Sequence, residues 1–578
     1  MKYTSHCNPS SILCVRIERV AGTARLMGVY GPMFSWIEKL ESNNDFPMAD
    51  VASARATLAD LPADDPLKAL EEITGWLVSI KETAGFRPER RAGVVMLLDE
   101  TAQPFHAMLL KEYLAAPHLQ DFHGMYIWKG IHAHMKAQAE AYGLCAQECR
   151  QPDKFPLEYK EIIPVIYVRL IRSLAEQMKL ELMRYIEIEQ TVWSQLFAAY
   201  QLAEANRMAD AMVYAYSGNP IHTNPQRELL RALVLYVSSP GTLAPEQIEV
   251  AYRVAGRMVS FFDMQEHPSA ECPNFVNLAM PAAPRRVDAQ LQPVATMRFF
   301  GTLRAVPKVE DITRQNESGM LQQEKRFGNE FSPDGKLTVL KHLHRYWSSV
   351  KPHRLGERSQ INAAIEVIHG YKTIGNLVAH IEPGQLQHLS EKDAAMLRQH
   401  SSIDLADEKI DYTTETWTLL DASGGGLGAI MPMTAGPWGK IGALCGLKTK
   451  QSNPWWVGAI RRIKTDAEGK VHAGIEILAR KPLAVWLRIL GKGAEKVSNW
   501  ETSSGSFEYD YLHVILLPDS QNSYLNATML MESGSYVAGQ IYEMMMGEKS
   551  RNIRFTGLLA EGDDFEQVSF QWMEAAPG

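Results

Sequence analysis

The sequence WWVGAIRRIKTDAEGKVHAGIEIL, residues 455–478, decides the fold of the C-terminal half of the chain. Two runs rich in Val and Ile, in which apolar residues alternate with others, flank the polar sequence TDAEGK at 465–470. This pattern is typical of a β-hairpin. Upstream, WTLLDASGGGLGAIMP at 417–432 and KIGALCGL at 440–447 add further candidate strands and a glycine-rich turn. Together these stretches predict a group of short antiparallel strands joined by turns.

The same region carries two short motifs in a fixed order. Arg354 and Arg358 are four residues apart in KPHRLGERSQINAAIEVIHGY at 351–371, and Asp421, Ser423 and Gly426 follow in DASGGG. The R-x-x-x-R and D-x-S-x-x-G pair, followed by the WWVGAIRR hairpin, resembles the PilZ family of cyclic di-GMP receptors. The resemblance implies that these five residues contact the ligand on a small antiparallel β-barrel over residues 345–490, with the strands at 456–462 and 473–477 packing its floor.

Cyclic di-GMP contains two phosphates and two guanines. The flat guanidinium groups of Arg354 and Arg358 can form forked hydrogen bonds with phosphate or with guanine O6 and N7, and they can stack on a purine. The Asp421 carboxylate can accept from guanine N1 and N2, and Ser423 can donate or accept. We expect the glycines at 424–426 to allow close approach and positive φ. Weaker candidates for ligand contact are His353, Gly425 and Arg462.

Three features of this region favour other interpretations. Arg354 and Arg358 could be solvated surface charges and DASGGG a plain turn, because each motif alone is common. The segment before Asp421 is longer than in the family, which predicts an insertion at about 380–416 containing a helix and an acidic loop; such loops close at little cost. Glu357 lies within the arginine motif, and His353 occupies a position that in the family influences the number of ligands bound.

The N-terminal half has a different pattern. Residues 30–265 are rich in Ala, Leu, Met, Glu, Gln and Arg, interrupted by short breakers, which predicts an α-helical domain over 1–265. Leu170, Leu174, Met178 and Leu182 recur four residues apart, typical of an amphipathic helix. Only two weak copies of a repeat occur, so an irregular bundle is favoured over a solenoid.

The remaining segments complete a multidomain α + β architecture. Residues 266–344 are rich in proline and predict a linker and connecting segment, with one candidate strand at MRFFGTLRAV and a short helix at 336–349. Short strand-like runs at HVILLP, ATMLMES, GQIYEMMM, NIRFTGLLA and QVSFQW predict a further β-unit over 491–578.

Composition restricts the class of function. A net charge of -8 argues against a protein that coats nucleic acid through a general basic surface. No secretory signal and no long uncharged apolar run is visible, and six scattered cysteines favour reduced thiols, so we expect a cytoplasmic protein without a transmembrane segment. The pairs His132 and His134, and His342 and His344, lack further ligands for a metal site. No catalytic set or cofactor is expected.

These observations predict a non-enzymatic bacterial signalling effector. By resemblance, it binds cyclic di-GMP, and it relays the level of this messenger to an unidentified protein partner in motility, biofilm or polysaccharide control. The alternative is a PilZ-like adaptor that has lost ligand binding and acts through its helical domain.

Overall fold

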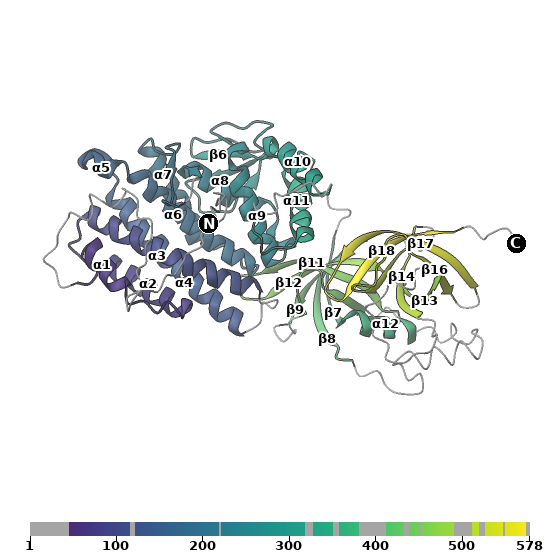
Figure 1. Ribbon diagram of the computed structural model, residues 1–578. Coiled ribbons are helices and arrows are strands. Elements are labelled where there is room, and N and C mark those ends of the chain that lie inside the picture. The colour runs from purple at the N-terminus through teal and green to yellow at the C-terminus, as the bar shows by residue number, and fades with distance from the viewer. Residues whose placement is uncertain are drawn as a thin grey trace, which may run out of the picture.

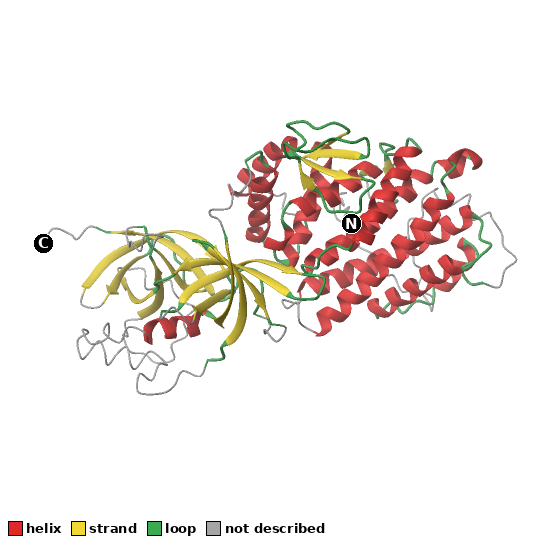
Figure 2. Cartoon of the chain, turned by 180° about the vertical axis from the view of Figure 1, so that it is seen from behind, coloured by secondary structure: helices red, strands yellow, loops and turns green. Residues whose placement is uncertain are grey.

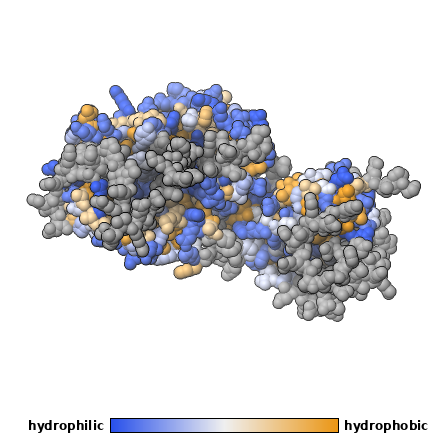
Figure 3. Space-filling model, viewed as in Figure 1, coloured by the Kyte–Doolittle hydropathy of each residue, from blue (hydrophilic) through white to orange (hydrophobic). Residues whose placement is uncertain are grey.

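The computed structural model describes residues 46–115, 122–218, 221–317, 327–350, 358–380, 412–432, 438–449, 454–490, 511–518, 526–546 and 549–573. Within these ranges the chain forms a helical lobe, residues 46–350, and a β lobe built of two six-stranded closed barrels (Figure 1). The predicted multidomain α + β class is confirmed. Figure 3 shows the two lobes side by side, with small apolar patches between hydrophilic residues.

Three helices of the helical lobe start at a capping residue that is followed by proline. Asp65, Asn224 and Ser332 each cap a helix through a side-chain oxygen, and a proline follows each of them at the first helical position. The helices of this lobe are α1 (Val51–Leu58), α2 (Pro66–Glu82), α3 (Pro88–Ala115), α4 (Phe122–Glu148), α5 (Leu157–Lys160), α6 (Ile163–Met183), α7 (Gln190–Ala205), α8 (Pro225–Val237), α9 (Pro245–Met258), α10 (Val306–Glu317) and α11 (Pro333–Trp347).

Helix α6 lies at the centre of the helical lobe, packed against α4, α7, α8 and α9. Its apolar residues are buried as predicted, but its polar faces are buried as well. Lys179, for example, is 2% exposed, and its Nζ lies 2.5 Å from Glu176 Oε2 and 2.7 Å from Glu249 Oε2. The four-residue spacing of the apolar side chains identified one buried face of α6. Its other faces can be buried too, because their charged side chains form ion pairs with other helices.

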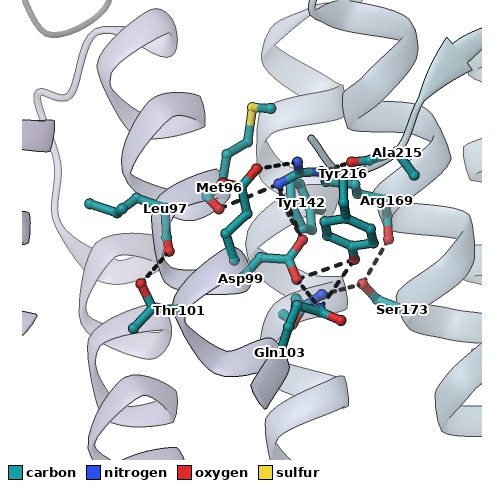
Figure 4. A network of polar contacts seen from close by, with 12 residues as sticks. Met96, Leu97, Asp99, Thr101, Gln103, Tyr142, Arg169, Ser173, Ala215 and Tyr216 are labelled. Atoms are coloured by element: carbon teal, nitrogen blue, oxygen red, sulfur yellow. Dashed lines mark hydrogen bonds and ion pairs between the residues drawn. The ribbon is translucent and has the colours of Figure 1, made fainter. Parts of the chain in front are cut away.

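A second buried ionic network joins α3, α4 and α6 (Figure 4). Asp99 and Arg169 are both fully buried. Arg169 contacts Glu100 Oε1 at 2.6 Å and donates to the Ala215 carbonyl at 2.7 Å. Asp99 accepts from the Tyr142 hydroxyl at 2.7 Å. Ala215 directly follows the short strand β1 (Val213–Tyr214), which pairs with β2 (His222–Thr223). The network therefore holds this small hairpin against the helix bundle.

The predicted linker at 266–344 is instead part of the helical lobe. Three of its strands form an antiparallel sheet with the preceding β3 (Asp263–Gln265), in the order β3, β6 (Met297–Gly301), β4 (Asn274–Asn277) and β5 (Arg285–Arg286). The strand predicted at MRFFGTLRAV is confirmed as β6. Helix α11 packs on α9, and Trp347 Nε1 donates to Ser238 Oγ at 2.8 Å. Strands this short, separated by prolines, are set by pairing with distant residues, which local sequence patterns do not show.

The first barrel contains six antiparallel strands. They are β7 (Ser359–His369), β8 (Glu415–Ala422), β9 (Gly426–Met431), β10 (Leu444–Thr449), β11 (Trp456–Thr465) and β12 (Val471–Ala479), closed in the order β10-β11-β12-β9-β8-β7. The hairpin predicted around TDAEGK is confirmed as β11 and β12. The expected insertion at 380–416 falls largely on residues outside the described ranges. The exceptions are His380, the last residue of helix α12 (Tyr371–His380), and residues 412–416, which lead into β8.

The second barrel follows after a link of three residues, 480–482. Its strands are β13 (Leu483–Leu490), β14 (Tyr511–Leu517), β15 (Thr528–Glu532), β16 (Ile541–Met546), β17 (Lys549–Glu561) and β18 (Phe565–Trp572), closed in the order β13-β14-β15-β18-β17-β16. The last five correspond to the five predicted C-terminal runs. Strand β13, expected to end the first barrel, belongs to the second because it pairs with β14 and β16.

Helix α12 lies against both barrels and is the helix beside the strands in Figure 2. Its apolar side chains Ile374, Leu377 and Val378 share a cluster with residues of each barrel. The helical lobe and the first barrel also share one continuous apolar cluster. Among the helices that the structure describes, none combines the length and the apolar character needed to cross a membrane.

Acid is expected to destabilise the helical lobe through His134. Burial, and next the nearby His106, lower the pKa of His134 to about 3. As the pH falls below 6.5, the His134 imidazole takes up a proton in the unfolded chain but stays neutral in the folded protein. This group therefore lowers the free energy of unfolding by about 1.4 kcal/mol per pH unit. Urea unfolding at pH 7 and at about pH 4.5 should show a smaller loss in His134→Asn than in the wild type.

The matched control for this prediction is His123→Gln on the same helix, since His123 is exposed. If the free energy of unfolding fell as much with pH in His134→Asn as in the wild type, His134 would not be the group that causes the loss.

Candidate nucleotide-binding site

The structure describes six of the eight predicted ligand-contact residues. Arg354 and His353 lie outside the described residues. The others are Arg358, Asp421, Ser423, Gly425, Gly426 and Arg462, and all six lie on the first barrel or at its edge.

The structure brings together Arg358 and Asp421, which are 63 residues apart in sequence. Arg358 directly precedes β7, and Asp421 on β8 is the register partner of Gln360 on β7. Arg358 Nη1 lies 2.7 Å from Asp421 Oδ1, and the two side chains are 41% and 22% exposed. The pairing of β7 with β8 therefore places a solvent-accessible guanidinium next to a carboxylate.

The DASGGG segment forms the tight turn between β8 and β9. Ser423 N donates to the Gly426 carbonyl at 2.8 Å, and Ser423 Oγ donates to the same oxygen at 3.2 Å. Ile477 N on β12 donates to the Gly425 carbonyl at 3.0 Å, which fixes the turn onto a third strand.

The expectation that these glycines adopt positive φ is wrong, because none of the three has φ in that region. Gly426 is required for close approach instead. A Cβ atom there would lie 2.9 Å from the Ile475 carbonyl oxygen of β12. Gly424 and Gly425 have open space around them, and so the steric constraint rests on Gly426.

A row of paired residues runs from Asp421 across the barrel. Asp421 pairs with Gly428 on β9, Gly428 pairs with Gly474 on β12, and Gly474 pairs with Arg462 on β11. Directly opposed residues of an antiparallel sheet present their side chains on the same face. The row, which we call the glycine strip, therefore has a carboxylate at one end, an arginine at the other and no side chains between them.

The glycine strip lies on the outer face of the barrel. Leu427 and Ala429, on either side of Gly428, are buried, and so are Ala473 and Ile475, on either side of Gly474. Because side chains alternate along a strand, the glycines face outward. Three interstrand spacings separate β8 from β11, which makes the strip roughly 14 Å wide.

The helical lobe borders the Arg462 end of the strip. A Cβ atom on Gly241, in the 3₁₀ turn Pro240–Thr242, would lie 2.9 Å from the Ile463 carbonyl and 4.0 Å from Arg462 Nε. At the end of the same strand, Thr465 N donates to the Tyr185 carbonyl at 2.7 Å. Strand β11 is thus shared between the strip and the contact with the helices.

Three residues at this site were missed in the sequence. Gly428 and Gly474 form the floor of the strip, and a Cβ atom at Gly428 would lie 2.7 Å from Asp421 Oδ1. Arg480 donates to the carbonyls of Ser423 at 3.4 Å and Gly424 at 3.2 Å, and its guanidinium lies 4.4 Å from the Trp456 ring centre. A glycine stands inside each of the two predicted strands, and this feature of the sequence could have indicated the floor, because a glycine within a strand often marks a close approach of a ligand or another backbone. No local signal identifies Arg480.

One histidine of each predicted pair has a structural role. His132 stacks on Trp128 and contacts Glu181 at 3.0 Å, while His342 contacts the Ser238 carbonyl at 2.6 Å. In the described ranges, no three or more His, Cys, Asp or Glu side chains are grouped so as to hold a metal ion.

Two family models match the chain. Residues 52–269 match the model described as the N-terminal domain of the cyclic-di-GMP receptor FimW, and residues 501–573 match the FimW C-terminal beta-barrel domain. Together they take in just over half of the 578 residues. The helical domain, to which the sequence motifs assigned no family, is thus matched, while the PilZ resemblance of the first barrel stays a prediction. A search of curated proteins found no significant match.

Proposed function

Because the chain belongs to the FimW family of cyclic-di-GMP receptors, we propose that it binds cyclic di-GMP on the glycine strip of the first barrel. It acts by binding rather than by catalysis. The observation that carries this proposal is the exposed ion pair of Arg358 and Asp421 beside a strip of two opposed glycines.

The Arg358–Asp421 pair has the chemistry that a guanine nucleotide needs. A guanine edge donates from N1 and N2 to the Asp421 carboxylate, which frees Arg358 to form forked hydrogen bonds with a phosphate. Exposed ion pairs contribute only about 0–1 kcal/mol, so exchanging this pair for ligand contacts costs little. The pair keeps both groups in position before the ligand arrives.

The glycine floor suits a flat ligand. Without a Cβ atom at Gly474, a purine ring can approach the backbone there. Gly428 is buried beneath the Asp421 carboxylate, so the ring meets the backbone at Gly428 once that carboxylate turns to the guanine edge. Arg354 and His353, which precede Arg358 in the chain, complete the ligand contacts in the proposal. Ser423 and Gly426 shape the turn at the edge of the strip. Arg462 supplies positive charge at the far end of the strip.

The route of the signal in this proposal is strand β11. Ligand contact with Arg462 acts on the strand that also receives the helical lobe at Gly241 and Tyr185. A change in how the barrel sits on the helices then alters the surface offered to a protein partner. The proposal places this effector in the cytoplasm, with motility, biofilm or polysaccharide control as its outputs. The free, buried state of Cys145, Cys149, Cys272 and Cys445 is consistent with reduced thiols.

Removing either member of the ion pair is expected to weaken binding. Arg358→Ala loses the phosphate donors and Asp421→Ala loses the guanine acceptor, so each should raise the Kd for cyclic di-GMP at least about tenfold in calorimetric titration. Arg285→Ala, an exposed arginine on β5 of the helical lobe, is the control and should bind like the wild type.

Wild-type affinity in both ion-pair variants would place the site elsewhere. If the wild type did not bind cyclic di-GMP at all, the alternative function, an adaptor that has lost ligand binding, would be favoured.

A further inference from the structure

The two barrels have the same strand topology. When the strands of each barrel are numbered one to six along the chain, both close in the order 1-2-3-6-5-4. Every neighbouring pair in both barrels is antiparallel. In this correspondence β13 is the counterpart of β7, the strand that Arg358 directly precedes. Strands β14, β15 and β18 are the counterparts of β8, β9 and β12, which carry Asp421, Gly428 and Gly474.

We infer that the second barrel is a topological copy of the first in which the counterpart of the nucleotide face has become a docking surface. The chain then has a single cyclic di-GMP face, and its two barrels move as one body. This inference rests on the proposed function for the identity of the ligand, but the docking surface itself is defined by the contacts described below.

The two outer faces differ in chemistry. On the first barrel the outer face presents Asp421, Gly428 and Gly474. On the second barrel, the inward residues of β13, β14 and β15 form that barrel's own core, including Val485, Val514, Leu516 and Met529. Their neighbours point outward and belong to a separate apolar cluster with α12 and the first barrel, namely Ala484, Ile515, Leu517 and Leu530. An acceptor for guanine is replaced by aliphatic side chains.

Helix α12 covers this apolar face. Ile374 of the helix is fully buried, as are Ile515 and Leu530 beneath it. The Tyr371 hydroxyl lies 2.7 Å from the His513 carbonyl and 3.2 Å from the Leu530 carbonyl, on β14 and β15. A Cβ atom at Gly375 would lie 3.0 Å from the His513 ring. A nucleotide could reach these strands only if the helix left them.

Two further connections tie the barrels together. The link between β12 and β13 is three residues long, and its first residue, Arg480, contacts the Ser423–Gly424 turn of the glycine strip. Lys440 of the first barrel forms an ion pair with Asp563 in the turn between β17 and β18. With α12 between them, the barrels are held at three places.

Hydrogen exchange of the full chain with and without cyclic di-GMP tests the single face. Ligand is expected to protect amides in residues 415–431 and 471–479 and to leave residues 511–532 unchanged. Ligand-dependent protection of 511–532 that persists in Asp421→Ala would overturn the inference, because it would reveal a second face. Absence of protection anywhere in the wild type would instead refute the proposed function, so the two failures are distinguishable.

The docking surface is tested without ligand. Ile374→Asp puts a charge into the buried contact and is expected to speed amide exchange in β14 and β15 at least about tenfold, while β8 and β9 stay unchanged. Tyr371→Phe, which removes only the hydroxyl, should give a smaller increase and serves if Ile374→Asp does not fold. Lys372→Ala is the matched control, because it removes only a largely exposed ion pair with Glu532 of β15, and such pairs contribute about 0–1 kcal/mol. Unchanged exchange in both core variants would overturn the docking surface.

Discussion

Gly428→Val is expected to abolish cyclic di-GMP binding while leaving the barrel folded. A Cβ atom at this position would lie 2.7 Å from Asp421 Oδ1 and 2.9 Å from its Cγ, so the carboxylate must move away from its place beside Arg358. The added methyl groups also stand on the strip where a purine would lie. Loss of the carboxylate contact together with steric exclusion should raise the Kd at least about a hundredfold, equivalent to about 2.7 kcal/mol.

The matched control is Gly424→Ala in the adjacent turn. Its Cβ atom meets nothing within 4 Å, and Gly424 does not have the positive φ that would disfavour alanine. Calorimetry on both variants, with circular dichroism to compare their β content, separates a blocked site from a disrupted strand. If Gly428→Val bound like the wild type, the ligand could not lie on the glycine strip.

Arg169→Met is expected to destabilise the helical lobe by about 3–5 kcal/mol, because it leaves the fully buried Asp99 carboxylate without its cation. Methionine keeps most of the length of the side chain, so the loss reflects charge rather than a cavity. The variant also removes the donors to Glu100 and to the Ala215 carbonyl. Urea unfolding followed by far-ultraviolet circular dichroism measures the change in the free energy of unfolding.

Two comparisons make this prediction specific. Arg150→Met changes an exposed arginine and should alter stability by no more than about 0.5 kcal/mol. Adding Asp99→Asn to Arg169→Met removes the unpaired charge and should recover part of the loss, since the two sites are coupled. A loss below about 1 kcal/mol in Arg169→Met would mean that the network contributes little to stability.

The fold class could be predicted because its signals are local. Alternation of apolar residues on either side of TDAEGK predicted the hairpin of β11 and β12, and the five C-terminal runs predicted β14 to β18. Of the sheet at 263–301 only β6 was predicted, from MRFFGTLRAV, and the other strands of this sheet and the assignment of β13 could not be predicted in this way. Their strands are defined by partners elsewhere in the chain, as when Leu483 of β13 pairs with Leu516 of β14.

The candidate site was predictable in its charged residues and not in its shape. Arg358 and Asp421 stood in recognisable motifs, and the pairing of β7 with β8 brings them within 2.7 Å of each other. The floor formed by Gly428 and Gly474 depends on the register of β8, β9 and β12, which no segment specifies alone. Arg480 reaches the turn only because the link to the second barrel begins there.

The sequence by itself determined which segments become the helices of the first lobe and most strands of the barrels, and which side chains can bind a guanine nucleotide. These properties follow from periodicity and functional groups within a few residues. Only the tertiary structure decided where Asp421, Gly428, Gly474 and Arg462 meet, that α6 lies buried on all sides, and that the second barrel repeats the first with its outer face closed by α12. These properties arise from strand register and packing between residues far apart in the chain. A pattern within a few residues cannot predict them, because it does not contain the partners of these contacts.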